Sequence, residues 1–137
     1  MRYPGECMDI FHILRGMCIL LIDDDEWIRD SLCIFFESEG CHIVALETAE
    51  EGLNALADQR FDIIIADYKL PGMNGIEFIS KIDRHCPDAV KVLITAYPTE
   101  TVEQRAIQAG VRKIVAKPFT AGIILDCLAE VLSTEGT

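Results

Sequence analysis

Residues 61–75 read FDIIIADYKLPGMNG, an apolar run that ends on an aspartate and is followed by turn residues. The run Ile63–Ala66 shows no polar alternation, which is typical of a strand buried on both faces of a parallel sheet. Asp67 follows the run directly, and the PG and NG dipeptides after it favour a tight turn. The stretch therefore predicts a buried strand that carries a carboxylate at its carboxyl end.

The same pattern, a short apolar run and then a segment of helical period, occurs five times along the chain. The predicted strands are Cys18–Ile22, His42–Leu46, Phe61–Ala66, Val90–Thr95 and Val111–Ala116. The predicted helices are Glu26–Ser38, a segment that a capping box opens at Thr48 and Glu51, about Gly75–His85, a segment between Pro98 and Gly110, and a segment from near Thr120. Alternating strands and helices predict an α/β fold, a parallel sheet with helices on both faces.

Charged and polar residues follow four of these strands at the edge where open α/β sheets bind ligands. Asp23 and Asp24 follow the first strand and Asp67 the third, so three carboxylates are expected to converge. Clustered carboxylates repel one another unless a cation neutralises them, and oxygen ligands suit Mg²⁺. Thr95 adds a hydroxyl and Lys117 a mobile positive charge, and together these would hold an anion on Asp67.

The net charge of the 137-residue, 15.3 kDa chain is −11, from 12 Lys and Arg against 23 Asp and Glu. Residues 1–67 hold 15 acids and 4 bases, whereas residues 68–137 hold eight of each. An acidic chain repels nucleic-acid phosphates, so direct nucleic-acid binding is not expected. A composition that is 50% hydrophobic excludes disorder for most of the chain.

The sequence also indicates where the protein works. No apolar run approaches the roughly 18 residues of a membrane helix, and the acidic N-terminus does not resemble a signal peptide. The six cysteines form no CxxC pair, which favours reduced thiols over a disulfide framework or a zinc site. A cytoplasmic protein with no membrane contact is therefore expected.

Residues 1–15 precede the repeating pattern and are expected to form an N-terminal extension, before a domain at 16–133 and a tail at 134–137. The segment Met8–Leu14 is open to three interpretations: an extra helical turn, a dimer contact or a disordered leader. The initial Met1 favours an intact N-terminus. One domain suits the length of the chain.

Four motifs occur in order at the strand ends: ILLIDDDE, FDIIIADYKLPGMNG, VLITAY and VAKPF. Together they resemble the receiver (CheY-like) domain of two-component response regulators over about Arg15–Leu132. The resemblance implies a flavodoxin-like (βα)5 fold with strand order 2-1-3-4-5. It implies a signalling module rather than an enzyme. Such a module catalyses only its own phosphorylation and dephosphorylation.

The resemblance also implies a role for each strand-end residue. Asp67 resembles the phosphoacceptor, whose carboxylate attacks phosphorus to form an acyl phosphate. Thr95 is expected to hydrogen-bond the phosphoryl group and Lys117 to pair with it. The family's Lys–Pro bond is typically cis, so Lys117–Pro118 is a cis candidate.

The implied metal is Mg²⁺ or Mn²⁺. By resemblance, Asp24 looks like a direct ligand and Asp23 a partner that acts through metal-bound water. Asp67 and the backbone carbonyl of Lys69 complete the expected ligand set.

Two features depart from the family pattern or vary within it. Ile114, three residues before Lys117, stands where many receivers have a Tyr or Phe whose rotamer reports phosphorylation. Tyr97 and Lys69 occupy the positions that flank the path of the hydrolytic water in the family. We hypothesise that this bulky ring and long amine slow autodephosphorylation.

The resemblance implies partners as well. A sensor histidine kinase or phosphotransfer protein would supply the phosphoryl group, and a phosphorylation-linked dimer is a further expectation. The face built by the helix after Pro98, the strand Val111–Ala116 and the helix from Thr120 would meet a downstream protein or output domain. Trp27 is predicted to pack over the mouth of the site or on its own helix, and no catalytic role is assigned to His12, His42 or His85.

Three other functions compete with this interpretation. A receiver-like scaffold that needs no phosphorylation is favoured by Ile114 alone. A haloacid-dehalogenase-type hydrolase also begins with Asp-x-Asp, but it usually continues with Thr or Val where this chain has Trp27, and it needs a later acidic pair. A flavodoxin-type FMN site would need a Ser/Thr/Gly-rich loop where this chain has DDDEW.

Overall fold

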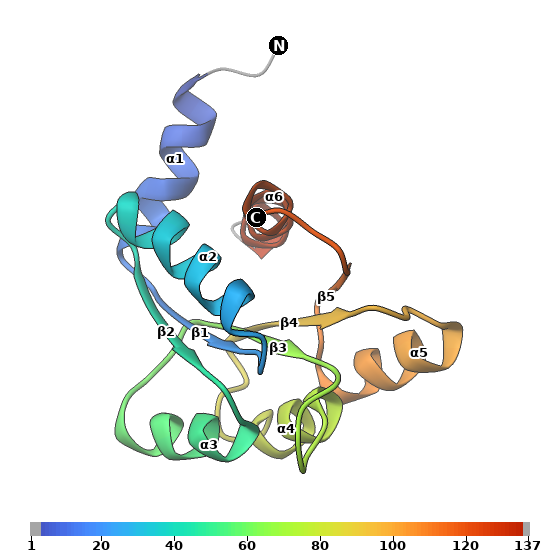
Figure 1. Cartoon of the computed structure of the whole chain (residues 1–137). Helices are drawn as coiled ribbons and strands as arrows, with labels where there is room; N and C mark the ends of the chain where they lie inside the picture. The colour runs from blue at the N-terminus through green and yellow to red at the C-terminus, as the bar shows by residue number, and fades with distance from the viewer. Residues whose placement is uncertain (1–3, 136–137) are drawn as a thin grey trace.

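The computed structural model describes the backbone of residues 4–135 and the side chains of residues 10–133. Figure 1 shows a central sheet between two layers of helices, with α2 and α6 on one side and α3, α4 and α5 on the other. The elements in chain order are α1 (Pro4–Arg15), β1 (Cys18–Ile22), α2 (Glu26–Ser38), β2 (His42–Leu46), α3 (Ala49–Asp58), β3 (Ile63–Asp67), α4 (Gly75–Ile82), β4 (Val90–Thr95), α5 (Glu100–Ala109), β5 (Lys113–Ala116) and α6 (Ala121–Glu135).

The five strands are parallel and lie in the order β2-β1-β3-β4-β5, which confirms the predicted flavodoxin-like fold. The register brings the strand ends together: Ile22 lies beside Ala66, and Asp67 beside Ile94. Because parallel strands end at one edge, the carboxyl-terminal residues of β1, β3, β4 and β5 share one rim of the sheet.

Three predicted boundaries were wrong by two or three residues. β3 begins at Ile63 and not at Phe61, because the backbone N–H of Asp62 turns to donate to the carbonyl of Cys18. β5 begins at Lys113 and not at Val111, since Gly110 ends α5 with a left-handed φ of 108°. α4 ends at Ile82 rather than near His85, in a turn where His85 donates to the Ile82 carbonyl.

Each face of the sheet carries its own hydrophobic cluster, because successive strand residues point to opposite faces. Ile19 and Leu21 of β1 pack with α2 and α6, whereas Leu20 and Ile22 pack with α3, α4 and α5. All four side chains are fully buried. The two clusters fix the sheet from both sides and hold the strand ends rigidly in place.

The segment before β1 is a helix that packs on the domain. Ile10 and Leu14 of α1 are buried in the cluster shared by α2 and α6, and the Phe11 ring lies 6.2 Å from that of Phe35. Arg15 donates from Nε to the Glu39 carbonyl at 2.6 Å. Of the interpretations left open for Met8–Leu14, the structure therefore shows the helical one.

Two further features of the described residues bear on the sequence predictions. No helix within residues 4–135 is long and apolar enough to cross a membrane. The cysteines whose side chains are described are all free: Cys18, Cys33, Cys41, Cys86 and Cys127. Cys7 lies outside the described side chains.

Candidate functional site

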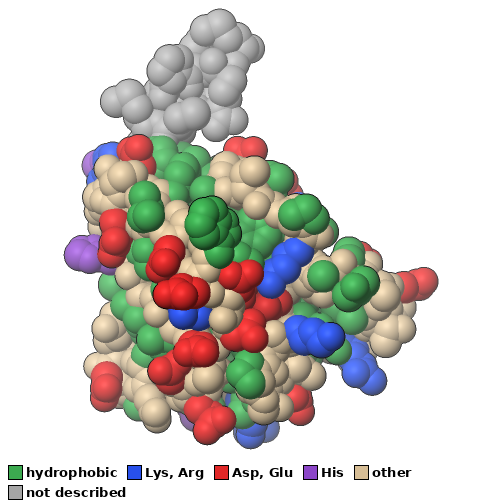
Figure 2. Space-filling model, in the orientation of Figure 1, with side chains coloured by type: hydrophobic (Ala, Val, Ile, Leu, Met, Phe, Trp, Pro, Cys, Tyr) green, Lys and Arg blue, Asp and Glu red, His purple; other side chains and the backbone are tan. Residues whose placement is uncertain are grey.

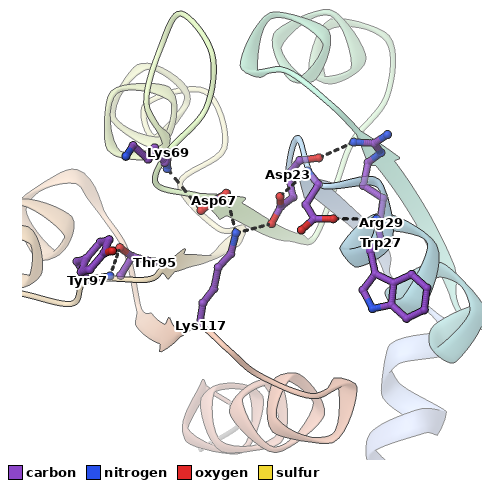
Figure 3. Close-up of polar contacts among 9 residues, drawn as sticks. Asp23, Trp27, Arg29, Asp67, Lys69, Thr95, Tyr97 and Lys117 are labelled. Atoms are coloured by element: carbon purple, nitrogen blue, oxygen red, sulfur yellow. Dashed lines mark hydrogen bonds and ion pairs between the residues drawn. The ribbon is translucent and has the colours of Figure 1, made fainter.

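The predicted site residues meet at the carboxyl edge of the sheet, where the side chains of Asp23, Asp67 and Lys117 point toward one another (Figure 3). Oxygens of Asp23, Asp24 and Asp67 all lie within 4.8 Å of one another. Asp23 and Asp67 are buried, whereas Asp24 is exposed. Figure 2 shows acidic side chains gathered on the face that carries the start of α2, with basic side chains beside them.

The β1–α2 turn holds its carboxylates through local hydrogen bonds. The N–H of Asp25 donates to Asp23 Oδ1 at 2.9 Å, and Asp25 caps α2 by accepting from the N–H of Trp27 at 2.9 Å. The N–H of Asp23 donates to the Leu46 carbonyl, so β2 fixes the start of the turn. Asp residues suit this position because their short side chains satisfy the free N–H groups of a helix start.

Asp67 lies at the end of β3 with 3% of its surface exposed. The N–H of Lys69 approaches Asp67 Oδ1 at 3.4 Å, and Tyr68 ties the loop to β4 by donating to the Ile94 carbonyl. The start of α4 comes very close, since a Cβ on Gly75 would lie 2.3 Å from the Asp67 carbonyl oxygen. A glycine is therefore required where the PGMNG turn returns to the strand.

Lys117 lies between the two buried carboxylates. Its Nζ is 2.9 Å from Asp67 Oδ2 and 3.4 Å from Asp23 Oδ2, and its peptide bond to Pro118 is cis, as the family resemblance implied. Burial lowers the pKa of Lys117, but the hydrogen bond to Asp67 and the charges of both aspartates outweigh it, so the pKa is raised. The amine stays protonated and compensates part of the buried negative charge.

Asp23 carries the least compensated charge in the site. Its Oδ2 is buried without a hydrogen-bond partner among the described residues and has only the ion-pair contact with Lys117. The pKa of Asp23 is raised to about 6, mainly by burial and also by the negative charge of Asp67. The hydrogen bond from the Asp25 N–H and the charge of Lys117 lower the pKa, but they do not cancel the rise. A buried carboxylate oxygen without a hydrogen-bond donor favours the binding of a cation.

These residues fit a hard divalent cation. Asp23, Asp24 and Asp67 supply only oxygen donors, within the spacing that one ion spans, and one of those donors is a buried oxygen without a hydrogen bond. Mg²⁺ takes oxygen ligands and keeps several waters, which suits a cluster that is open to solvent at Asp24. The predicted metal cluster is therefore present as a group of side chains.

Beside the carboxylates lies a cavity of about 380 Å³, lined among others by Asp67, Lys69, Thr95, Tyr97 and Lys117. Thr95 is buried, and its Oγ1 accepts from the N–H of Tyr97 at 3.1 Å. The Tyr97 side chain is 72% exposed and Lys69 is also exposed. The structure thus brings Tyr97 and Lys69 to the rim of one cavity, as their hypothesised effect on a water path requires.

Two residues differ from or extend the sequence predictions. Trp27 was predicted to pack over the mouth of the site or on its own helix, which is wrong, because its side chain is 79% exposed. Arg29 was missed, although its Nη1 donates to the Asp23 carbonyl at 2.9 Å. The sequence does contain a signal for this contact, because Arg29 lies about one helical turn after the Asp25 cap and can reach back to the β1–α2 turn. Ile114 is half-buried and packs on the α3–α5 side of the sheet.

A larger cavity, of about 920 Å³, lies at the opposite edge of the sheet between the ends of α3 and α4. It is lined by apolar side chains such as Leu53, Leu56 and Phe61, with charged residues that include Asp58 and Lys81. The three carboxylates lie at the other edge, so cavity size does not locate the chemistry in this fold.

Comparison with known proteins agrees with this geometry. The family model described as the response regulator receiver domain matches residues 19–129. The response regulator protein FleR of Pseudomonas aeruginosa is 32% identical over 111 residues, which cover 81% of this chain but only 24% of FleR. The chain thus spans about a quarter of the length of that relative.

Solved structures are similar over nearly the full length of this chain. A CheY-like receiver domain protein from Methanospirillum hungatei matches with a TM-score of 0.82 and 30% identity, covering 88% of this chain and 96% of the other. A response regulator from Burkholderia pseudomallei, solved with a phosphorylated aspartic acid, a calcium ion and citrate, matches with a TM-score of 0.77 and 25% identity over 88% and 73% of the two chains. The match to the family model over most of its length shows that this chain belongs to the response regulator receiver domain family.

Proposed function

We propose that Asp67 accepts a phosphoryl group from a phosphohistidine on a sensor histidine kinase or phosphotransfer protein, with Mg²⁺ or Mn²⁺ as the metal. The observation that carries this proposal is the placement of Lys117 Nζ 2.9 Å from the Asp67 carboxylate, in a cluster that holds two further carboxylates. A charged amine beside a buried acceptor, next to a cluster suited to a cation, is what in-line transfer of a phosphoryl group requires.

In the transfer, an Asp67 carboxylate oxygen attacks phosphorus while the phosphorus–nitrogen bond of the donor histidine breaks. The nitrogen keeps the electron pair of that bond and leaves as imidazole. Lys117 lies where it can neutralise charge on the phosphoryl oxygens, and the Thr95 hydroxyl lines the same cavity. Because both side chains are held before the donor arrives, little reorganisation accompanies the step.

Asp23, Asp24, Asp67 and the Lys69 carbonyl would hold the divalent cation. When bound, the cation supplies electrostatic stabilisation of the transferring phosphoryl group. The Burkholderia pseudomallei relative was solved with a phosphorylated aspartic acid and a calcium ion, which supports a phosphorylated aspartate and a divalent cation for this chain.

Loss of the phosphoryl group reverses the modification. Water attacks phosphorus, the bond between phosphorus and the Asp67 oxygen breaks, and inorganic phosphate leaves. Tyr97 and Lys69 lie on the rim of the cavity that water must enter, so we propose that both side chains slow this hydrolysis. The chain acts in this account as a signalling module whose only chemistry is on itself.

The phosphorylated form would differ from the unphosphorylated form in its protein contacts, by a shift between two packings of the domain. We place the responding face on α5, β5 and α6, where Ile107 and Ile123 are exposed at 69% and 47%. A downstream protein, an output domain or a second copy in a phosphorylation-linked dimer would contact this face, in the cytoplasm.

The test is incubation with phosphoramidate, a small donor with the same phosphorus–nitrogen bond, followed by intact-mass measurement. The proposal predicts a gain of one phosphoryl group that requires Mg²⁺ and is absent in Asp67→Asn. Asp62→Asn, which changes an aspartate at the opposite edge of the sheet, is the matched control and should be phosphorylated normally. No gain in the unchanged protein would favour the phosphorylation-independent scaffold, for which Ile114 at the switch position is the supporting residue.

A further inference from the structure

Arg29 is a basic residue whose side chain contacts the backbone of the acidic β1–α2 turn. Its guanidinium donates from Nη1 to the Asp23 carbonyl at 2.9 Å, while its own N–H donates to the Asp25 carbonyl within α2 (Figure 3). The side chain is half-buried. The bond to Asp25 is the ordinary backbone bond of the first helical turn, so the bond to the Asp23 carbonyl is the one that depends on the arginine side chain.

The other hydrogen-bonding groups of Asp23 show why this contact matters. The Asp23 N–H is taken by the Leu46 carbonyl, and its Oδ1 by the Asp25 N–H. β1 ends at Ile22, so the Asp23 carbonyl lies beyond the ladder, and Arg29 supplies its donor. The contact therefore fixes the Asp23 carbonyl, which lies beyond the strand ladder.

Arg29 and Lys117 differ in which oxygens they contact, and therefore in which oxygens remain available to a cation. Lys117 lies against carboxylate oxygens of Asp67 and Asp23, which a cation must also contact. Arg29 binds a backbone oxygen instead and leaves Asp23 Oδ2 without a hydrogen bond. It can thus hold the turn without competing with a cation for its ligands.

The location of Arg29 is not explained by the needs of the helix, and Arg29 forms no ion pair with the residues whose side chains are described. It lies in the first turns of α2, where the helix dipole disfavours a cation. The other described bases of residues 1–67 have acidic partners elsewhere: Arg15 lies 3.7 Å from Glu39, and Arg60 3.8 Å from Asp62. Arg29 is set apart from both by its hydrogen bond to a backbone carbonyl of the candidate metal site.

We propose that Arg29 is a positioning residue for the divalent cation, which fixes the β1–α2 turn so that Asp23 and Asp24 meet the ion in the required geometry. The inference rests on the proposed function, and it adds a residue that acts through the ligands rather than on the phosphoryl group. Groups that orient metal ligands typically change metal affinity by about 10-fold to 100-fold when they are removed.

The experiment is calorimetric titration of Mg²⁺ into the full chain without a phosphodonor. Arg29→Met should raise the Mg²⁺ dissociation constant by about 10-fold. Arg60→Met removes the same charge from the same acidic half of the chain, at an exposed side chain at the opposite edge of the sheet, and should leave the constant unchanged within about two-fold. The difference should persist at 0.5 M NaCl, where surface charges are screened to about 4 Å.

Arg29→Lys distinguishes the geometry of the guanidinium from its positive charge. It also tests the inference if Arg29→Met does not fold. Lysine keeps the charge but lacks the planar fork of arginine, so most of the loss should remain. In phosphorylation assays, Arg29→Lys should raise the Mg²⁺ concentration needed for half-maximal rate, with the maximal rate within about two-fold of the unchanged protein.

Three outcomes would overturn the inference: an unchanged constant in Arg29→Met, an equal change in Arg60→Met, or full recovery in Arg29→Lys. Absence of Mg²⁺ binding by the unchanged protein would overturn the proposed function and this inference with it. Normal binding by every variant would overturn the inference alone.

Discussion

A lysine lies near each edge of the sheet, buried at the amino edge and half-buried at the carboxyl edge, and the two are held in different ways. At the amino edge, Lys91 is 1% exposed and donates to Asp83 Oδ1 at 2.8 Å and to the Cys86 carbonyl at 2.5 Å. At the carboxyl edge, Lys117 is shared between two carboxylates, and Asp23 Oδ2 is left without a hydrogen bond. At the amino edge, the buried charge of Lys91 therefore has its partners within the protein. At the carboxyl edge, Asp23 Oδ2 lacks such a partner, and a bound cation would supply one.

The contrast distinguishes a structural ion pair from a binding site. Burying a charge is unfavourable unless it is paired and hydrogen-bonded, so a fold normally satisfies such groups. Residues that stay unsatisfied at a rigid edge, with a pKa raised as that of Asp23 is, indicate function rather than stability. Opposite responses to mutation at the two edges are therefore expected.

The largest stability effect is expected at the amino edge. Asp83→Ala leaves the charge of Lys91 buried without its partner, which should lower the free energy of unfolding by about 3 kcal/mol. Urea denaturation measures this change, with Asp88→Ala on the following loop as the matched control. A loss below about 1 kcal/mol would show that Lys91 is not held as the structure indicates.

At the carboxyl edge, removal of a buried carboxylate should raise the free energy of unfolding instead of lowering it. Without metal at pH 7, Asp23→Asn should raise the free energy of unfolding by about 1–3 kcal/mol, because a pKa of about 6 against an ordinary 3.8 means that the folded state bears an unfavourable charge. Lys117 Nζ lies 2.9 Å from Asp67 Oδ2 in the unchanged protein, so we expect the amine to keep a carboxylate partner in this variant.

The pH dependence follows from the same pKa. As the pH falls from 7 toward 4, the folded wild-type protein binds a proton at Asp23 before the unfolded chain does, so the wild type gains stability and the advantage of Asp23→Asn shrinks. Urea titrations in EDTA from pH 7 to pH 5 test this, with Asp24→Asn as a control that removes the same charge at an exposed position. A pH-independent difference would contradict the assignment to Asp23.

Mg²⁺ should stabilise the carboxyl edge by a smaller amount. At ten times its dissociation constant, a ligand that binds only the folded state adds about 1.4 kcal/mol to the free energy of unfolding. Thermal unfolding with Mg²⁺ and with EDTA should show this gain in the wild type and in Glu26→Gln, but not in Asp24→Asn. Asp83→Ala should retain the gain, because its defect lies at the other edge; equal stability with and without Mg²⁺ in the wild type would argue against a metal site.

The smallest expected effect concerns the rim of the cavity. Tyr97→Ala and Lys69→Ala should each shorten the half-life of the phosphorylated protein by about three-fold, which corresponds to about 0.7 kcal/mol in activation free energy. Loss of phosphoryl mass with time measures the rate, and Lys81→Ala, an exposed lysine of α4, is the control. Unchanged half-lives in both rim variants would refute the hypothesis.

Most of the fold was predictable from the sequence, because the signals were local. Apolar runs marked each strand, and the capping box at Thr48 and Glu51 placed the start of α3. The convergence of Asp23 and Asp67 followed from their positions at the ends of parallel strands. The strand order and the residue roles could be stated only through resemblance to the receiver family.

Other features depended on contacts between distant segments. Lys91 lies within an apolar strand, and nothing in the run itself shows that Asp83 lies beside it. The packing of Ile10 and Leu14 of α1 could not be predicted, because it depends on distant residues of α2 and α6 in the same hydrophobic cluster. Nothing in the sequence around Trp27 shows that its side chain is 79% exposed.

If Asp67 is the phosphoacceptor, the acyl phosphate forms on Asp67 itself. After phosphorylation with phosphoramidate and Mg²⁺, borohydride reduction converts a phosphorylated aspartate to homoserine, and peptide mass mapping locates the change. We predict homoserine at position 67 and at no other aspartate. Modification at Asp23, Asp24 or a residue outside the carboxyl edge, with Asp67 unchanged, would contradict the account.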